Sequence, residues 1–279
     1  MSGATNIDAH LRLLSSEPMF DVEISAICNL RCTVCPRGGI SRPMGLMDAQ
    51  TIRDVAAFLP PRSRVAISGL GEPLMNPAAA QAVEAFRSRG ARVGIVTNAS
   101  LLSPELATGL IAAGLDFIEM SWPCHLGDAG AAESIRASIA AFADSRPKTL
   151  KAYLSVTLTD PMRDELLAIR AFAGRHRLTP LVRPVHSRGG ALYLPAQPAR
   201  RGCGLFAKVT FVAWDGTLLS CCNDVKGESA LGSVRGHDFE ALLRSKEDAI
   251  RSGSWFPACG RCDDPHRFSL LDKPLPGGI

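Results

Sequence analysis

Residues 28–35 of the chain read Cys28-Asn29-Leu30-Arg31-Cys32-Thr33-Val34-Cys35 and bring three cysteines close together. Thiolates are the usual protein ligands of iron–sulfur clusters, and four of them normally fill one cluster. Three thiolates can hold three irons of a four-iron cluster and leave the fourth iron open. A set of three cannot be paired entirely into disulfides, and structural zinc needs four closed ligands. The spacing therefore favours a cluster loop with one open coordination position.

The chain has 279 residues, nine cysteines, a net charge of +4 and 46% hydrophobic residues. This length suits one sizeable core, or a core domain with a small appendage. The charge is too small and dispersed to argue for nucleic acid or an anionic membrane. The start of the chain lacks a secretory signal, and no stretch approaches the ~20 apolar residues of a membrane span. We expect a cytoplasmic protein whose cysteines bind metal or take part in catalysis.

Short apolar runs alternate with amphipathic segments over much of the chain. The expected strands are 20–26, 64–68, 92–97, 117–121, 152–158 and 180–184, and the expected helices are 48–59, 77–89, 104–113, 131–143 and 161–175. Three helices begin with a capping residue before a proline, at Asn76-Pro77, Ser103-Pro104 and Asp160-Pro161. This alternation predicts an α/β fold, a partial, open (β/α)6 barrel with its chemistry at the carboxyl ends of parallel strands.

The pattern changes after the sixth expected strand. Segments 208–214 and 217–220 flank Asp215-Gly216, a hairpin signal, and a helix is expected near 238–251. This region holds a second set of cysteines, Cys203, Cys221, Cys259 and Cys262. Four thiolates complete either a closed [4Fe–4S] cluster or a structural zinc site. We expect an N-terminal extension over 1–19, a barrel over 20–190, a linker over 191–202, a small α+β domain over 203–265 and a tail over 266–279.

The first cysteine set resembles the cluster loop of the radical S-adenosylmethionine (radical SAM) superfamily. The resemblance implies a [4Fe–4S] cluster on Cys28, Cys32 and Cys35, whose open iron binds the amine and carboxylate of SAM. Family members usually have an aromatic residue just before the third cysteine, where this chain has Val34. Any stacking of an aromatic ring on the adenine is therefore weaker or is supplied elsewhere.

Three further stretches match positions that lie near SAM in this family. Ser68-Gly69-Leu70-Gly71-Glu72-Pro73 resembles its Gly-Glu-Pro motif, although Leu70 separates two glycines that are often adjacent. Thr97-Asn98-Ala99-Ser100 follows the third strand, and Ser121 ends the fourth. The resemblance implies SAM contacts by five residues, which are Gly69, Gly71, Glu72, Asn98 and Ser121.

The second cysteine set resembles a Twitch domain, which is a shortened SPASM domain, and this implies an auxiliary [4Fe–4S] cluster in place of zinc. The stretch His186-Ser187-Arg188-Gly189-Gly190 resembles the matching stretch of 2-deoxy-scyllo-inosamine dehydrogenases, the Twitch-bearing radical SAM alcohol dehydrogenases of aminoglycoside biosynthesis. The likeness extends to the seventeen residues between Cys203 and Cys221. It makes Arg188 and His186 candidates for the substrate site, against the alternative of a surface ion pair.

Cys124 and His125 follow the fourth expected strand and therefore lie at the mouth of the expected site. A thiol S–H bond is weak enough to give a hydrogen atom to a carbon radical, and a histidine can move protons near neutral pH. A buried apolar cysteine explains Cys124 equally well. Cys222, next to Cys221, allows the same two interpretations.

The resemblance implies reductive cleavage of SAM to a 5′-deoxyadenosyl radical, which abstracts a hydrogen atom from an unactivated carbon. We expect oxidation of a small molecule, such as a sugar or cyclitol, with an electron passing to the auxiliary cluster. The expected reductant is a flavodoxin- or ferredoxin-type protein. The alternatives are an epimerase in which Cys124 or Cys222 returns a hydrogen atom, a peptide-modifying maturase, and a zinc-stabilised binding module.

Overall fold

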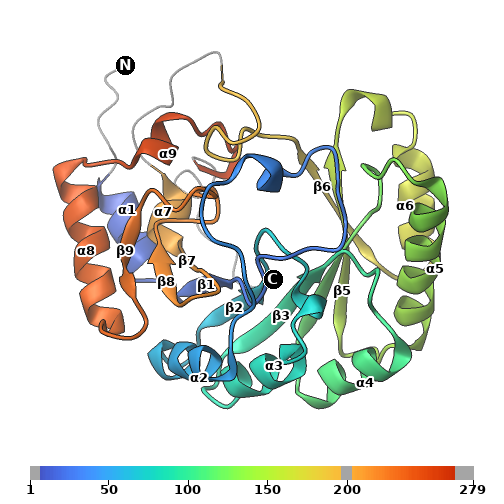
Figure 1. The fold of residues 1–279 in the computed structure, drawn as a ribbon, viewed down its shortest axis with the longest axis horizontal. Helices are drawn as coiled ribbons and strands as arrows, with labels where there is room; N and C mark the ends of the chain where they lie inside the picture. Colours follow the sequence, from blue (N-terminus) through green and yellow to red (C-terminus); the bar gives the residue numbers. More distant parts are fainter. Residues whose placement is uncertain (1–6, 196–202, 268–279) are drawn as a thin grey trace.

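The computed structural model describes residues 7–195 and 203–267, and it confirms the parallel α/β core (Figure 1). Six strands pair in chain order, each parallel to the next: β1 (Met19–Val22), β2 (Arg64–Ile67), β3 (Arg92–Thr97), β4 (Phe117–Ser121), β5 (Lys151–Leu158) and β6 (Thr179–Pro184). The helices that follow them cover the outer face: α2 (Ala49–Phe58), α3 (Ala79–Arg87), α4 (Pro104–Ala112), α5 (Ala129–Ser145) and α6 (Leu166–Arg175). The sheet curves into the predicted partial barrel.

Successive residues of each strand point to opposite faces of the sheet. On one face, fully buried apolar side chains pack beneath the helices; they include Val22, Ile67, Ile95, Ile118 and Leu154. On the other face, polar and apolar side chains together line cavities inside the barrel; the polar ones include Asp21, Glu119, Ser155, Thr157 and Arg183. The alternation of the sequence thus separates the core from the site.

The C-terminal unit continues the sheet of the barrel. Strand β7 (Val209–Val212) pairs in parallel with β1, and Glu23 N donates to Val212 O at 2.8 Å just beyond the pair. Strands β8 (Thr217–Leu219) and β9 (Ala230–Ser233) follow antiparallel, so that one sheet of the described residues runs β6-β5-β4-β3-β2-β1-β7-β8-β9. The predicted hairpin is confirmed, whereas the predicted domain boundary lies within a continuous sheet and stays a prediction.

Four helices cover the β7–β9 end of the sheet: α1 (Ile7–Leu14), α7 (Gly204–Lys208), α8 (Phe239–Ser252) and α9 (Pro257–Gly260). The first three of these helices, α1, α7 and α8, share a second apolar cluster built around Leu13, Phe206 and Ile250. The predicted helix near 238–251 is confirmed as α8, but α1, α7, α9 and β9 were not predicted. Each is short; α1 and α7 pack in the second cluster, and β9 pairs with β8.

Two predicted helices begin later than their proline signals. Asn76 accepts from Ala78 N at 2.9 Å and donates to the carbonyls of Ile24 and Met47, so it ties two loops together ahead of α3. Short 3-10 turns occupy Pro36–Gly39 (η1), Pro73–Met75 (η2) and Asp160–Met162 (η3), the last of which precedes α6. Parts of the predicted extension, linker and tail, 1–6, 196–202 and 268–279, lie outside the described residues. None of the described helices is both long and apolar enough to cross a membrane.

Replacing Ile118 by alanine should lower the free energy of unfolding by about 2–5 kcal/mol, because a buried β4 side chain then leaves a cavity beneath the helices. Its exposed fraction is 0%. Urea unfolding of the cluster-free protein, followed by circular dichroism, measures the loss. Leu167 on α6 is 77% exposed and serves as the control. Its alanine variant should stay within about 0.5 kcal/mol of the wild type, and equal losses would contradict the assigned core.

Candidate active site and auxiliary cysteine site

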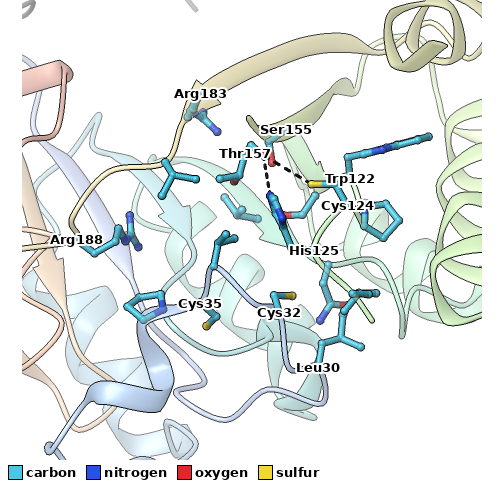
Figure 2. Close-up of a pocket in the computed structure, with 18 of the residues that line it drawn as sticks. Leu30, Cys32, Cys35, Trp122, Cys124, His125, Ser155, Thr157, Arg183 and Arg188 are labelled. Carbon is cyan, nitrogen blue, oxygen red and sulfur yellow. Dashed lines mark hydrogen bonds between the residues drawn. The ribbon is translucent and has the colours of Figure 1, made fainter. Parts of the chain in front are cut away.

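The loop after β1 carries Cys28, Cys32 and Cys35 to the carboxyl end of the parallel strands (Figure 2). Arg37 closes this loop, because its guanidinium donates to Cys28 O at 3.0 Å and to Leu30 O at 2.7 Å. Cys35 N donates to Cys32 O at 3.1 Å, which turns the loop between these two cysteines. Burial raises the pKa of the Cys32 thiol, and the charges of Cys35 and Cys28 raise it further. Sequence reasoning missed Arg37, which is one of many arginines without a pattern around it.

Loops from three other strands hold the cysteine loop in place. Glu72 N, after β2, donates to Ile27 O at 2.8 Å. Asn98, after β3, donates from Nδ2 towards Cys28 Sγ at 3.7 Å. His125 O, after β4, accepts from Thr33 N at 3.1 Å. The structure thus brings the predicted residues Asn98 and His125 to the predicted cluster loop.

Glu72 is buried, and its carboxylate joins the loops after β2 and β3. The carboxylate accepts from Leu74 N at 3.1 Å, Thr97 Oγ1 at 2.6 Å and Asn98 N at 2.7 Å. Burial raises the pKa of Glu72, and these hydrogen bonds oppose the rise. The carboxylate therefore braces the loop that carries Asn98. Its contact with the SAM amine stays a prediction.

Two glycines of the same motif allow close approach of the backbone. Gly69 has φ +129°, and a Cβ on it would lie 2.5 Å from Glu23 Cγ. A Cβ on Gly71 would lie 2.2 Å from Ser25 O and 2.4 Å from Ile27 O, in the segment leading to the cysteines. Gly71 is thus required by packing against the start of the cluster loop, whichever ligand the loop binds.

Two cavities with shared lining residues lie inside the barrel, and Figure 2 shows the outer one. The outer cavity, of about 350 Å³, is lined by Cys32, Cys35, Asn98, Ser121, Cys124 and His125, among others. The inner chamber, of about 500 Å³, is lined by Asp21, Glu119, Arg183, His186, Arg188 and Cys222, among others. Gly69, Glu119, Arg183 and Arg188 line both. The structure therefore brings most of the predicted SAM and substrate residues to these two cavities.

Cys124 and His125 lie side by side against the end of β5. His125 Nε2 lies 2.8 Å from Thr157 O, and Cys124 Sγ lies 3.8 Å from the same oxygen. A carbonyl oxygen only accepts, so the His125 Nε2 carries a proton. Burial raises the pKa of Cys124 to about 11, which keeps its thiol protonated at neutral pH. The site thus presents an S–H group to the outer cavity.

Charged side chains of both signs surround the inner chamber. Arg183 forms two hydrogen bonds with the Glu119 carboxylate, at 2.6 and 3.1 Å. Arg188 has a left-handed backbone, φ +51°, and Figure 2 shows its side chain directed towards the cavity. Burial raises the pKa of Asp21 to about 6, against a hydrogen bond with Cys222 and the charge of Arg188. Sequence reasoning missed Asp21, because a single acidic residue in a strand resembles a solvated one.

His186 lies at the rim of this chamber, with Nε2 at 3.7 Å from Asp264 Oδ2. Burial lowers the pKa of His186, and the charge of Asp264 opposes this effect. The predicted pair of His186 and Arg188 therefore faces the chamber, as a substrate role requires, and the contact with Asp264 connects it to the C-terminal unit.

The four C-terminal cysteines gather beneath the β7–β9 end of the sheet. Cys203 precedes α7, Cys221 follows β8, Cys259 lies on α9 and Cys262 follows it, and they are between 4% and 8% exposed. Burial raises the pKa of all four thiols, to about 11 for Cys203. The buried Arg267 donates to the carbonyls of Cys259 and Cys262, at 2.7 Å each.

Two segments of the chain match known families. Residues 22–122 match the radical SAM superfamily, and residues 203–263 match SPASM, an iron–sulfur cluster-binding domain. The chain contains a radical SAM domain followed by a SPASM domain. The first match ends at Trp122, one residue beyond β4, and the second spans all four C-terminal cysteines.

Two curated proteins are similar over part of their length. The tungsten-containing aldehyde ferredoxin oxidoreductase cofactor-modifying protein of Pyrococcus furiosus is 33% identical over 36% of this chain and 29% of its own length. A probable GTP 3′,8-cyclase of Methanothermobacter marburgensis is 35% identical over 41% of this chain and 37% of its own. The chain thus spans about a third of the length of these relatives.

Solved structures share the fold over most of this chain. BtrN in complex with AdoMet and 2-DOIA superimposes with a TM-score of 0.63 at 18% identity, over 89% of this chain and 94% of that one. SuiB of Streptococcus suis, bound to the precursor peptide SuiA, gives 0.67 at 13% identity, over 95% and 80%. Native anSMEcpe with bound AdoMet gives 0.63 at 12% identity, over 88% and 89%. These likenesses confirm the predicted barrel with its C-terminal hairpin and helix.

SAM and two [4Fe–4S] clusters are the cofactors of this pair of domains, and the residues present fit them. The loop of Cys28, Cys32 and Cys35 supplies three thiolates, two of them from residues that line the outer cavity, while the other four cysteines are buried in the C-terminal unit. In the described part of the chain, no three His, Cys, Asp or Glu side chains stand close enough to share a single metal ion. The fit therefore rests on the thiol donors and their enclosure.

Replacing Gly71 by alanine should displace the segment before Cys28 and reduce the iron bound by that loop several-fold. Iron and sulfide counts after anaerobic reconstitution measure the loss. Gly109→Ala on α4 is the matched control, since nothing lies within 4 Å of a Cβ placed there. That variant should bind iron like the wild type. Full loading of the Gly71 variant would show that the loop tolerates the extra atom.

Proposed function

We propose that the chain is a radical SAM oxidoreductase that oxidises a small polyhydroxylated molecule, such as a sugar or cyclitol. The observation that supports this most is the charged inner chamber, which extends from the outer cavity beside Cys32 and Cys35 to Cys222, next to the auxiliary site. When bound, the first cluster with SAM supplies a 5′-deoxyadenosyl radical that takes a hydrogen atom, and the auxiliary cluster supplies an acceptor for one electron. The likeness of the fold to BtrN, solved with AdoMet and 2-DOIA, is consistent with this proposal.

Arginine and carboxylate side chains give the chamber its affinity for hydroxyl groups. A hydroxyl both donates and accepts, so it can bond to the Glu119 carboxylate and to the Arg183 or Arg188 guanidinium. Arg188 forms no ion pair within the described residues, which leaves its donors for a ligand. Its left-handed backbone holds the side chain towards the cavity at a cost in strain. We assign substrate binding to Arg188, Arg183 and Glu119.

Asp21 is the proton acceptor in this proposal. Oxidation of an alcohol to a ketone removes a hydrogen atom from carbon, a proton from oxygen and one further electron. The Asp21 carboxylate faces the same chamber as Arg188 and is hydrogen-bonded with Cys222. Because burial raises its pKa to about 6, it holds a proton more readily than an ordinary aspartate yet is mostly ionised at neutral pH. That combination suits a general base.

The outer cavity positions the reacting carbon and excludes water from it. Leu30, Val34 and Leu126 supply apolar surface around Cys32 and Cys35. Holding the carbon in a near-attack geometry accounts for much of the barrier reduction in such a reaction. Cys124 presents its protonated thiol at the same wall, which favours the second candidate, an epimerase in which a thiol returns the hydrogen atom.

The surface beside the cluster loop supports a protein reductant. Ile27, Met44 and Leu46 are 39%, 51% and 37% exposed, and a β-bridge between Ser25 and Leu46 brings the segments together. We propose that a flavodoxin- or ferredoxin-type protein delivers electrons here, in the cytoplasm. A peptide substrate remains the third candidate, because SuiB with its precursor peptide has the same fold.

Deuterium transfer tests the proposed oxidation. Anaerobically reconstituted protein, given SAM, a strong reductant and ring-deuterated aminocyclitols, inositols or hexoses, should move deuterium into 5′-deoxyadenosine and release a ketone. Solvent deuterium at the reacting carbon, lost in Cys124→Ala or Cys222→Ala, would indicate the epimerase instead. No 5′-deoxyadenosine under any of these conditions would contradict radical chemistry, and transfer only from peptides would indicate a maturase.

Replacing Asp21 by asparagine should slow ketone formation at least about 10²-fold, because the chamber loses its proton acceptor. Wild-type ketone formation should rise as pH increases through about 6, where Asp21 becomes ionised, and the variant should lack this rise. Deuterium transfer into 5′-deoxyadenosine should continue in the variant, which separates loss of the base from loss of the fold. Asp248→Asn, at an exposed position on α8, is the control. Wild-type rates in the Asp21 variant would exclude this role.

A further inference from the structure

Lys246 is a fully buried lysine in the C-terminal unit. Its side chain lies on α8 and is 1% exposed. The ammonium donates to Phe206 O at 2.9 Å and to Val209 O at 2.8 Å, and it stands 5.4 Å from the centre of the Phe206 ring. No carboxylate of the described residues forms an ion pair with it. The two carbonyls accept hydrogen bonds from the ammonium and the ring lies beside it, but none of these groups carries a negative charge that would neutralise it.

An unpaired buried ammonium is costly, and such groups usually either find a counter-charge or lose their proton. Burial lowers the pKa of Lys246 to about 7, and the negative charges that oppose this effect are those of Cys221 and Cys203. Both cysteines belong to the auxiliary site. The contact of Lys246 with Phe206 O places the ammonium against α7, three residues after Cys203, and Cys203 and Phe206 belong to the same buried cluster. The negative partner that this position offers Lys246 is the group that the auxiliary cysteines hold as thiolates.

We propose that the Lys246 ammonium is the counter-charge of the auxiliary iron–sulfur cluster and raises its reduction potential. The potential of such a cluster depends on the charge around it. A fixed positive charge stabilises the reduced form, which carries one more negative charge, over the oxidised form. The inference rests on the proposed role of the auxiliary cluster as an electron acceptor, and it assigns the residue that makes electron transfer to it favourable.

Two buried cations of the described residues act on this site, Lys246 and Arg267. Arg267 bonds to the backbone at Cys259 and Cys262, and its charge also lowers the pKa of Cys203. The carboxylate of Asp224 acts on Cys259, and that of Asp264 acts on Cys262. Removing the Lys246 charge would leave a more negative environment, so the potential should fall.

Lys208 provides a matched control. It ends α7, is 6% exposed, and its ammonium donates to Ser16 Oγ at 2.7 Å and to the carbonyl of Glu17. Burial also lowers the pKa of Lys208, but the charges that act on it are those of Glu17 and Arg64. Lys208 thus shares the burial and the carbonyl contact of Lys246 without its coupling to the thiolates.

Redox titration of the auxiliary cluster tests the inference without any substrate. In a Cys28→Ala, Cys32→Ala, Cys35→Ala background, the protein is reconstituted anaerobically and titrated with monitoring by electron paramagnetic resonance. Lys246→Gln keeps a donor for the carbonyls but removes the charge. It should shift the equilibrium towards the oxidised cluster at least about tenfold, which is about 59 mV for one electron. Lys208→Gln should leave the reduction potential unchanged. Lys246→Arg keeps the positive charge, so its potential should lie close to that of the wild type.

The outcomes separate this inference from the proposed function. An unchanged potential in Lys246→Gln, or an equal fall in Lys208→Gln, would overturn the counter-charge role and leave the oxidoreductase proposal intact. Zinc in place of iron in the wild-type site would overturn both. If Lys246→Gln binds no iron, loading of the Lys246→Arg variant decides: full loading supports a role for the charge, and failure overturns it.

Discussion

The position of β1 between two parallel neighbours is the constraint on which the site depends. On one side, β1 is hydrogen-bonded to β2, which joins it to the sheet of the barrel. On the other side, it is hydrogen-bonded to β7, which attaches the C-terminal unit in a fixed register with Val22 opposite Val212. The cysteine loop leaves the carboxyl end of this strand, and Asp21 points from it into the chamber. Because one short strand pairs with both units, they share one continuous sheet, and the inner chamber extends from the barrel to Cys222, next to the auxiliary cysteine Cys221.

The loops around the first cysteine set are held by hydrogen bonds that use ordinary groups. The Glu72 carboxylate, the Arg37 guanidinium and the Asn98 amide each satisfy backbone or sulfur atoms of neighbouring loops. Gly71 lets one loop approach another more closely than a Cβ would permit. These contacts hold the loop in place through groups of the chain itself, which reduces the ordering cost of assembling the site.

Burial of charge distinguishes the interior of this protein from an ordinary barrel core. Asp21 is hydrogen-bonded with Cys222, and the charge of the adjacent Cys221 acts on Lys246. In surroundings of low polarity, an ionised group acts strongly on its neighbours. The proposed proton acceptor and the proposed auxiliary cluster site are therefore connected through two adjacent residues.

The sequence by itself predicted the two cysteine sets, the alternating strands and helices of the barrel, the glycine motif and the hairpin, because each depends on spacing within a few residues. The tertiary structure alone showed the burial of Asp21 and Lys246 and the contacts of Arg37 with the cysteine loop. Each is a lone charge with no local pattern, and Lys246 lies on an amphipathic helix where a lysine is usually solvated. Their burial follows from contacts distant in the chain, such as Met19 with Val209 and Lys246 with Phe206. Local patterns cannot report such contacts, since burial depends on what packs against a side chain.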